Sequence, residues 1–93
     1  MKNTKTLSII DGNFTSDEAR EILSEMISFK INFHSLKNWS SLERYGKDDE
    51  VAQKRIPILK KEMEKLHAIL SEAQKNNKRL VVSADVNITL IDE

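Results

Sequence analysis

The sequence AQKRIPILKKEMEKLHAILSEA, residues 52–73, carries apolar side chains at alternating steps of four and three residues. This spacing places them on one stripe of an α-helix that packs along a second helix. Most of the other positions are Lys, Glu, Arg or Gln, so we expect the remaining surface of this helix to be solvated. The stripe consists of Ala52, Ile56, Leu59, Met63, Leu66, Leu70 and Ala73.

Pro57 interrupts this stretch, because proline lacks an amide hydrogen and its ring collides with the carbonyl of Gln53, four residues earlier. The apolar stripe nevertheless keeps its phase through residues 52–59. We therefore predict one helix over residues 49–75, kinked at the proline. The alternative is a main helix that begins near Arg55 after a separate turn.

A first long helix is predicted over residues 16–44. Thr15 and Glu18 have the spacing of a capping box at its start, and Gly46 is suited to the left-handed conformation that closes a helix. The link to the next helix is then a tight antiparallel αα-hairpin, in which residues whose numbers sum to about 93 lie level. The apolar face expected to meet the second helix consists of Ala19, Ile22, Leu23, Met26, Phe29, Phe33 and Leu36.

Two strands are predicted outside the hairpin, over residues 5–10 and 79–91. The first is expected to stop at the turn signal of residues 11–13, Asp-Gly-Asn, and the second shows a clean two-residue alternation. Because the helices run out and back, the strands should pair as a small antiparallel β-ribbon. Part of the longer strand would then lack a partner, and a break at residues 83–85, as a bulge or a second hairpin, is an alternative. The predicted fold is α+β, one domain over residues 1–93, in the order β-α-α-β.

Self-association is expected, because a two-stranded ribbon on one helix pair gives a small core. The distal half of the first helix also carries a second apolar set, Ile31, Trp39 and Leu42, with Tyr45 close by. We predict a homodimer that uses this set as its interface, and a different protein partner is the alternative. The corresponding function is a non-enzymatic, homo-oligomeric interaction or scaffold protein of the helical-hairpin, coiled-coil type.

A row of basic and polar side chains offers a second function. Anion-binding candidates on the first helix are Lys30, His34, Lys37 and Arg44, and Lys47 extends the row into the loop. Such a row could hold phosphates while Trp39 or Tyr45 stacks on a base. Fifteen basic and fifteen acidic residues give zero net charge, however, so this row is more typical of a solvated face and nucleic acid is an unfavoured partner.

The sequence contains little that indicates a metal site or an enzyme active site. Glu64 and His67 have the spacing of a bundle di-metal motif, but the helix-one positions expected to face them are apolar, so no metal or other cofactor is predicted. No nucleophile lies in a recognisable frame, and both glycines suit turns. The absence of cysteine fits a reducing cytoplasm. The apolar run of residues 7–10 is too short for a signal peptide or a membrane span, so we expect a soluble, cytoplasmic protein without a membrane partner.

Overall fold

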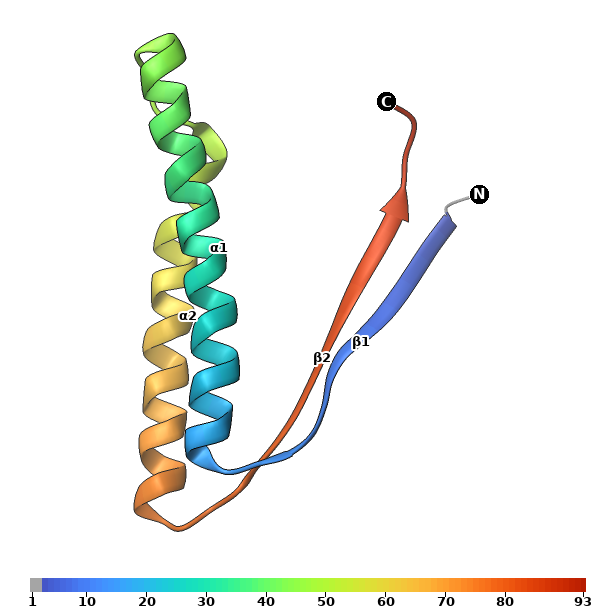
Figure 1. The fold of residues 1–93 in the computed structure, drawn as a ribbon, viewed down its shortest axis with the longest axis vertical. Coiled ribbons are helices and arrows are strands. Elements are labelled where there is room, and N and C mark those ends of the chain that lie inside the picture. The colour runs from blue at the N-terminus through green and yellow to red at the C-terminus, as the bar shows by residue number, and fades with distance from the viewer. Residues whose placement is uncertain (1–2) are drawn as a thin grey trace.

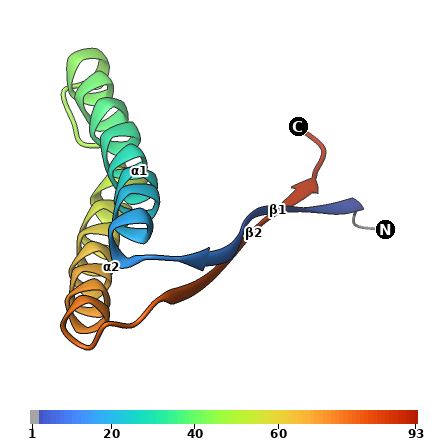
Figure 2. The ribbon, with the colours of Figure 1, turned by 60° about the horizontal axis from the view of Figure 1, so that its bottom comes forward.

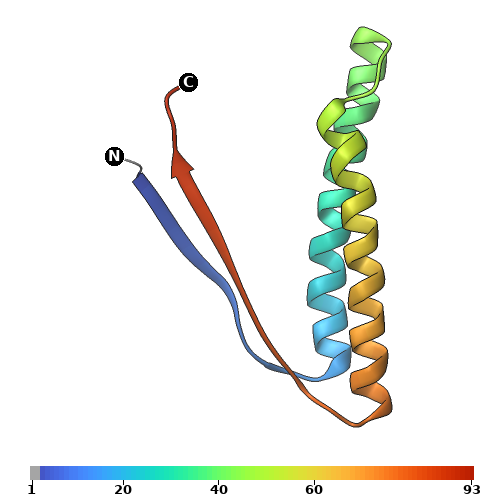
Figure 3. The ribbon, with the colours of Figure 1, turned by 180° about the vertical axis from the view of Figure 1, so that it is seen from behind.

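The computed structural model describes residues 3–93 and has the predicted β-α-α-β order. Strand β1 spans Asn3–Phe14, helix α1 Ser16–Tyr45, helix α2 Glu50–Lys75 and strand β2 Leu80–Leu90 (Figure 1). The two helices form a hairpin and the two strands form an antiparallel ribbon. The ribbon leaves the hairpin at the end where α1 begins and α2 ends, and then diverges from it, so the molecule has the shape of a V (Figures 1 and 3).

Local signals define the start and the end of α1. The hydroxyl of Thr15 accepts a hydrogen bond from the Glu18 amide at 3.1 Å, and the Glu18 carboxylate accepts one from the Thr15 amide at 2.9 Å. This is the predicted capping box, which satisfies amides that the first helical turn leaves without partners. At the other end Gly46 adopts a left-handed conformation, with φ of 68°, and closes the helix as predicted.

The link between the helices is ordered by side chains of α1. The Asn38 side-chain carbonyl accepts a hydrogen bond from the Asp49 amide at 2.7 Å, and its amide group donates to Asp48 Oδ1 at 3.0 Å. Ser41 Oγ donates to the Lys47 carbonyl at 2.8 Å. Asp49 then caps α2, which runs without interruption through Pro57. One continuous helix with a kink at Pro57 was the preferred prediction. Its continuity is confirmed, the alternative start near Arg55 is wrong, and the kink stays a prediction.

The core lies between the helices at the base of the hairpin. The α2 stripe read from the sequence is confirmed, since five of its seven side chains are buried and Ile56 and Met63 are half-buried. Leu66 and Leu70 form the centre of the core with Ala19. The partly buried side chains that pack against this centre come from all four elements and are Phe14, Leu23, Ile27, Met63 and Leu80.

The predicted inner face of α1 is correct at Ala19 and Leu23 and wrong at Ile22 and from Met26 onward. Phe29 and Leu36 are 69% and 68% exposed, and Met26 and Phe33 are exposed as well. The side chains turned inward are instead Ile27, Ile31 and His34, followed by Asn38 and Ser41. The physical reason is that Leu23 and Ile27 pack against the α2 core, while Asn38 and Ser41 make hydrogen bonds with residues 47–49 on the same side of α1.

The ribbon differs from the prediction in the length of β1. This strand continues through residues 11–13 to Phe14, because these residues pair with residues 81–83 of β2 instead of turning. All of β2 therefore has a partner within the chain, and the expected unpaired length is absent from the described residues. The irregularity predicted near residues 83–85 lies on the opposite strand, where Ile9 is an extra residue between the pairs Ser8–Asp85 and Ile10–Ala84.

This bulge gives the ribbon one apolar and one polar face. Residues on one face of a strand are normally two apart, but the extra residue shifts the phase, so Leu7 and Ile10 share a face. The polar face carries hydrogen bonds between the side chains of Thr4 and Thr89 and from Thr6 to Asn87, both at 2.9 Å. The apolar face carries Leu7, Ile10 and Phe14 from β1 and Leu80, Val82, Ala84, Val86, Ile88 and Leu90 from β2. Gly12, Lys5 and Asn3 of β1 lie on the same face, opposite Val82, Ile88 and Leu90.

Candidate interaction surfaces

The inner side of the V is lined by apolar side chains from both arms, and we call it the V surface. A cleft of about 880 Å³ lies where the arms meet, between Ile10 and Phe14 of the ribbon and Ile22, Met26 and Phe29 of α1. Figure 2 shows the ribbon extending away from the base of the hairpin, so the backbones of the two arms diverge towards their free ends. The V surface consists of Ile22, Met26, Phe29, Phe33 and Leu36 of α1 together with the apolar face of the ribbon.

Beyond the cleft, the V surface is open to solvent. Ile10 is buried, and Phe14 and Leu80 are half-buried against the core. Further along the same ribbon face, Val86 and Ile88 are exposed to 43% and 42%. Contiguous apolar surface of this kind is unusual on a monomer and commonly marks a contact with another molecule.

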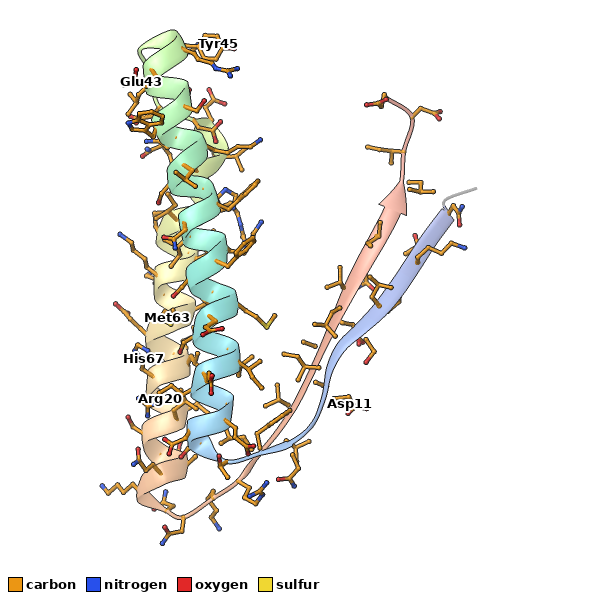
Figure 4. The ribbon with its side chains drawn as sticks, viewed as in Figure 1. Asp11, Arg20, Glu43, Tyr45, Met63 and His67 are labelled. Atoms are coloured by element: carbon orange, nitrogen blue, oxygen red, sulfur yellow. The ribbon has the colours of Figure 1, made fainter. Side chains whose placement is uncertain are left out.

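The structure does not place the four predicted interface residues on one surface. Trp39, Leu42 and Tyr45 are exposed, Trp39 to 62%. Tyr45 lies at the free end of the hairpin (Figure 4). Ile31 is half-buried on the side of α1 that faces α2, so it does not extend the surface formed by the other three. We call Trp39, Leu42 and Tyr45 the tip patch.

The predicted basic row is not one continuous exposed surface. Its centre, His34, is 6% exposed, and its Nε2 atom has no hydrogen-bond partner among residues 3–93. Burial, with smaller contributions from the charges of Lys30 and Arg55, lowers the pKa of His34, which favours the neutral imidazole. A neutral, enclosed histidine cannot contribute a charge to anion binding.

The lysines on either side of His34 are placed against an aromatic ring. The Nζ atoms of Lys30 and Lys37 lie 5.0 Å and 5.6 Å from the centre of the Phe33 ring, within the range of cation–π contact. Arg44 and Lys47 are exposed near the hairpin loop. The structure therefore separates the row into two lysines that flank the V surface and two cations near the tip.

Glu64 and His67 remain on the exposed side of α2. Within residues 3–93, no three His, Asp or Glu side chains come close enough together to hold a metal ion. In the same range, neither helix combines the length and apolar character needed to cross a membrane. The ion pair in this part of the chain joins Lys65 and Glu62 at 3.0 Å within α2, away from the basic row.

Comparison with known proteins finds no family model, no curated protein and no solved structure that matches this chain. Any functional argument therefore depends on the fold and its surfaces. The feature that the sequence reading assigned incorrectly is the V surface, because its α1 stripe was expected to face α2. The signal that could have revealed it is the presence of two apolar stripes on α1, of which α2 can cover one.

Proposed function

We propose that this protein is a non-enzymatic, self-associating module whose basic unit is a homodimer, and that it acts as an interaction or scaffold protein. The observation that carries the proposal is the amount of surface that a single chain leaves uncovered. The accessible surface is 7717 Å², whereas a compact monomer of 10.7 kDa is expected to expose about 5500 Å². The excess of about 2200 Å² per chain is larger than the roughly 800 Å² that each partner buries in a standard interface.

The overall dimensions support the same proposal. The radius of gyration is 16.8 Å, against about 12 Å for a compact chain of this length. The principal extents are 50 × 36 × 15 Å, so the chain is long and thin. Because a thin molecule cannot enclose many apolar side chains, burial against another molecule is the remaining way to shield them, and a second copy is the partner that we propose.

The polar constellations of the chain also favour a binding role over catalysis. Thr15 and Glu18 cap α1, and Asn38 and Asp49 order the loop and cap α2. The hydrogen-bonding capacity of these side chains is thus used within the fold. The tip patch offers surface of a different kind, because exposed Trp and Tyr are the residue types most enriched among the strongest contacts of interfaces.

Light scattering coupled to size-exclusion chromatography tests the proposal. From about 1 to 100 µM, we expect the wild-type chain to reach a molar mass of about twice 10.7 kDa. The emission of Trp39, the one tryptophan of the sequence, reports whether the tip patch takes part in the dimer, because burial at an interface would shift it to shorter wavelength.

Trp39→Glu tests the contribution of the tip patch. A charge at a buried interface position should weaken the dimer, whereas Gln74→Glu, which adds the same charge at an exposed position of α2, should not. A wild-type chain that stays monomeric at 100 µM and shows fully exposed tryptophan emission would contradict the proposed function.

A further inference from the structure

We propose that the V surface is the main self-docking surface of this protein, and that a second copy of the chain occupies the opening between α1 and the ribbon. This inference rests on the self-association proposed above and adds its location. It differs from the sequence-based prediction, which placed the interface around Trp39 at the tip.

The α1 wall of the V surface has the pattern of a helix-packing seam. Ile22, Met26, Phe29, Phe33 and Leu36 follow one another at steps of four, three, four and three residues, the spacing of helices that pack side by side over several turns. In the isolated chain this seam has no helical partner, since α2 lies against a different side of α1. Phe29, at its centre, is 69% exposed.

The ribbon wall is equally incomplete. A two-stranded ribbon is marginally stable unless its apolar face is covered. Near the base, Ile10, Phe14 and Leu80 pack against the hairpin core or close to it. The outer half of the same face, with Leu7, Val86, Ile88 and Leu90, is exposed in the single chain.

The ribbon of the same chain is held away from the seam at the base. Thr15 alone separates β1 from α1, and its capping box fixes the direction in which the strand leaves the helix. Arg79, just before β2, donates from Nε to Asn13 Oδ1 at 2.6 Å and from Nη2 to the Asn13 carbonyl at 3.4 Å. Phe14 and Leu80 are anchored in the core. These contacts oppose a rotation that would fold the ribbon down onto α1.

A second copy fits the opening for reasons of size, symmetry and charge. The excess of about 2200 Å² per chain lies in the range that obligate dimers bury. Both walls are mainly apolar, although Glu25 and Lys30 line the cleft and Lys5 lies opposite Ile88 on the ribbon. The same surface can therefore serve on both sides of a two-fold interface, as a symmetric dimer requires. On α1 the seam has acidic Glu18 and Glu25 on one flank and basic Lys30 and Lys37 on the other. A strongly acidic or strongly basic partner would be repelled from one flank, whereas another copy carries both signs.

The first experiment compares charge insertion on and off the V surface. We expect Phe29→Glu on α1 and Ile88→Glu on the ribbon to raise the dissociation constant of the dimer by at least about 30-fold, the size of a strong interface contact. The matched controls are Ile69→Glu on α2 and Thr89→Glu on the polar ribbon face, next to the second test position. Molar mass from light scattering gives the constant, and far-UV circular dichroism checks the fold.

The second experiment covers the case in which the charged variants do not fold. The sequence lacks cysteine, so Phe29→Cys and Ile69→Cys each introduce one unambiguous labelling site of similar solvent exposure in the single chain. In the assembled protein we expect a maleimide to label residue 29 at least about tenfold more slowly than residue 69, because docking encloses the first and leaves the second open.

The outcomes separate the two proposals. A wild-type monomer in which residue 29 labels as fast as residue 69 contradicts both self-association and its location. If the wild type is a dimer, the charge variants at residues 29 and 88 do not weaken it, and a cysteine at residue 29 labels fast, the proposed location is wrong but self-association stands. A monomer with a protected residue 29 also overturns the location, because the ribbon of the same chain would then cover the seam. The inference is supported if the charge variants at residues 29 and 88 weaken or abolish the dimer while both control variants keep it. In addition, a cysteine at residue 29 must react slowly with the maleimide.

Discussion

Leu70→Ala is the substitution that most directly measures the hairpin core. Leu70 is 0% exposed and is the largest side chain that the described residues bury completely. It forms the core centre with Ala19 and Leu66, and Phe14 and Leu80 of the two strands pack against the same cluster. Removing the isopropyl group at the end of its side chain therefore leaves a space bordered by three elements besides its own helix, which cannot all relax into it.

We expect the free energy of unfolding to fall by about 3 to 4 kcal/mol, the sum of the lost transfer energy and the cost of the remaining cavity. A domain of this length has a total stability of about 5 to 14 kcal/mol, so the loss should lower the melting temperature by about 15 to 25 °C. Urea denaturation followed by circular dichroism, at one fixed protein concentration, gives the free energy directly.

Ile69→Ala is the matched control, because it removes a side chain of equal size from the neighbouring position. Ile69 is 53% exposed, so its loss should cost about 1 kcal/mol or less. Equal losses at residues 69 and 70 would refute the packing of α2 described here. A shift of the whole helix by one residue would reverse their order.

Three further predictions concern other parts of the chain. Burial lowers the pKa of His34 in the folded state, so below about pH 6.5 the unfolded chain binds a proton at this residue more readily than the folded chain does. The free energy of unfolding should therefore fall from pH 7.5 to pH 5.5 in the wild type and fall less in His34→Leu. Urea midpoints at the two pH values measure this difference. Gly46→Ala should cost about 1 kcal/mol, because φ of 68° strains a residue that carries a Cβ, and an unchanged urea midpoint would contradict this. Polyanion binding should be weak at physiological salt, since the net charge is zero and His34 is buried; tight, salt-dependent binding that Lys37→Glu with Arg44→Glu abolishes would instead support the anion-binding function.

Several elements of the fold could be read from the sequence because each depends on residues close together in the chain. The α2 stripe from Ala52 to Ala73 requires a helix with one buried side, and every member of the stripe is buried or half-buried. Thr15 with Glu18 and the left-handed Gly46 mark the two ends of α1 through contacts within a few residues. The alternation in β2 likewise defined a strand with one apolar face.

The candidate sites could be predicted only in part. The exposure of Trp39, Leu42 and Tyr45 agrees with the expected outer surface of α1, whereas Ile31 lies on the inner side. Helical spacing predicted the basic row, but it did not predict that His34, at the centre of the row, is buried. The reason is that α1 carries apolar residues on more than one side, so spacing alone could not decide which side α2 covers.

Tertiary contacts determine the length of β1, the faces of the ribbon and the side of α1 that faces outward. Pairing with residues 81–83 holds residues 11–13 in β1, although Asp-Gly-Asn in isolation favours a turn. The bulge at Ile9 brings Leu7 onto the same face as Ile10, which a strict two-residue period does not allow. Packing of Leu23 and Ile27 against the core and the hydrogen bonds of Asn38 and Ser41 with the loop occupy one side of α1, so Phe29 and Phe33 face outward. The sequence by itself thus determined the elements and their caps, whereas the faces they present depend on partners distant in the chain, whose geometry exists only in the folded molecule.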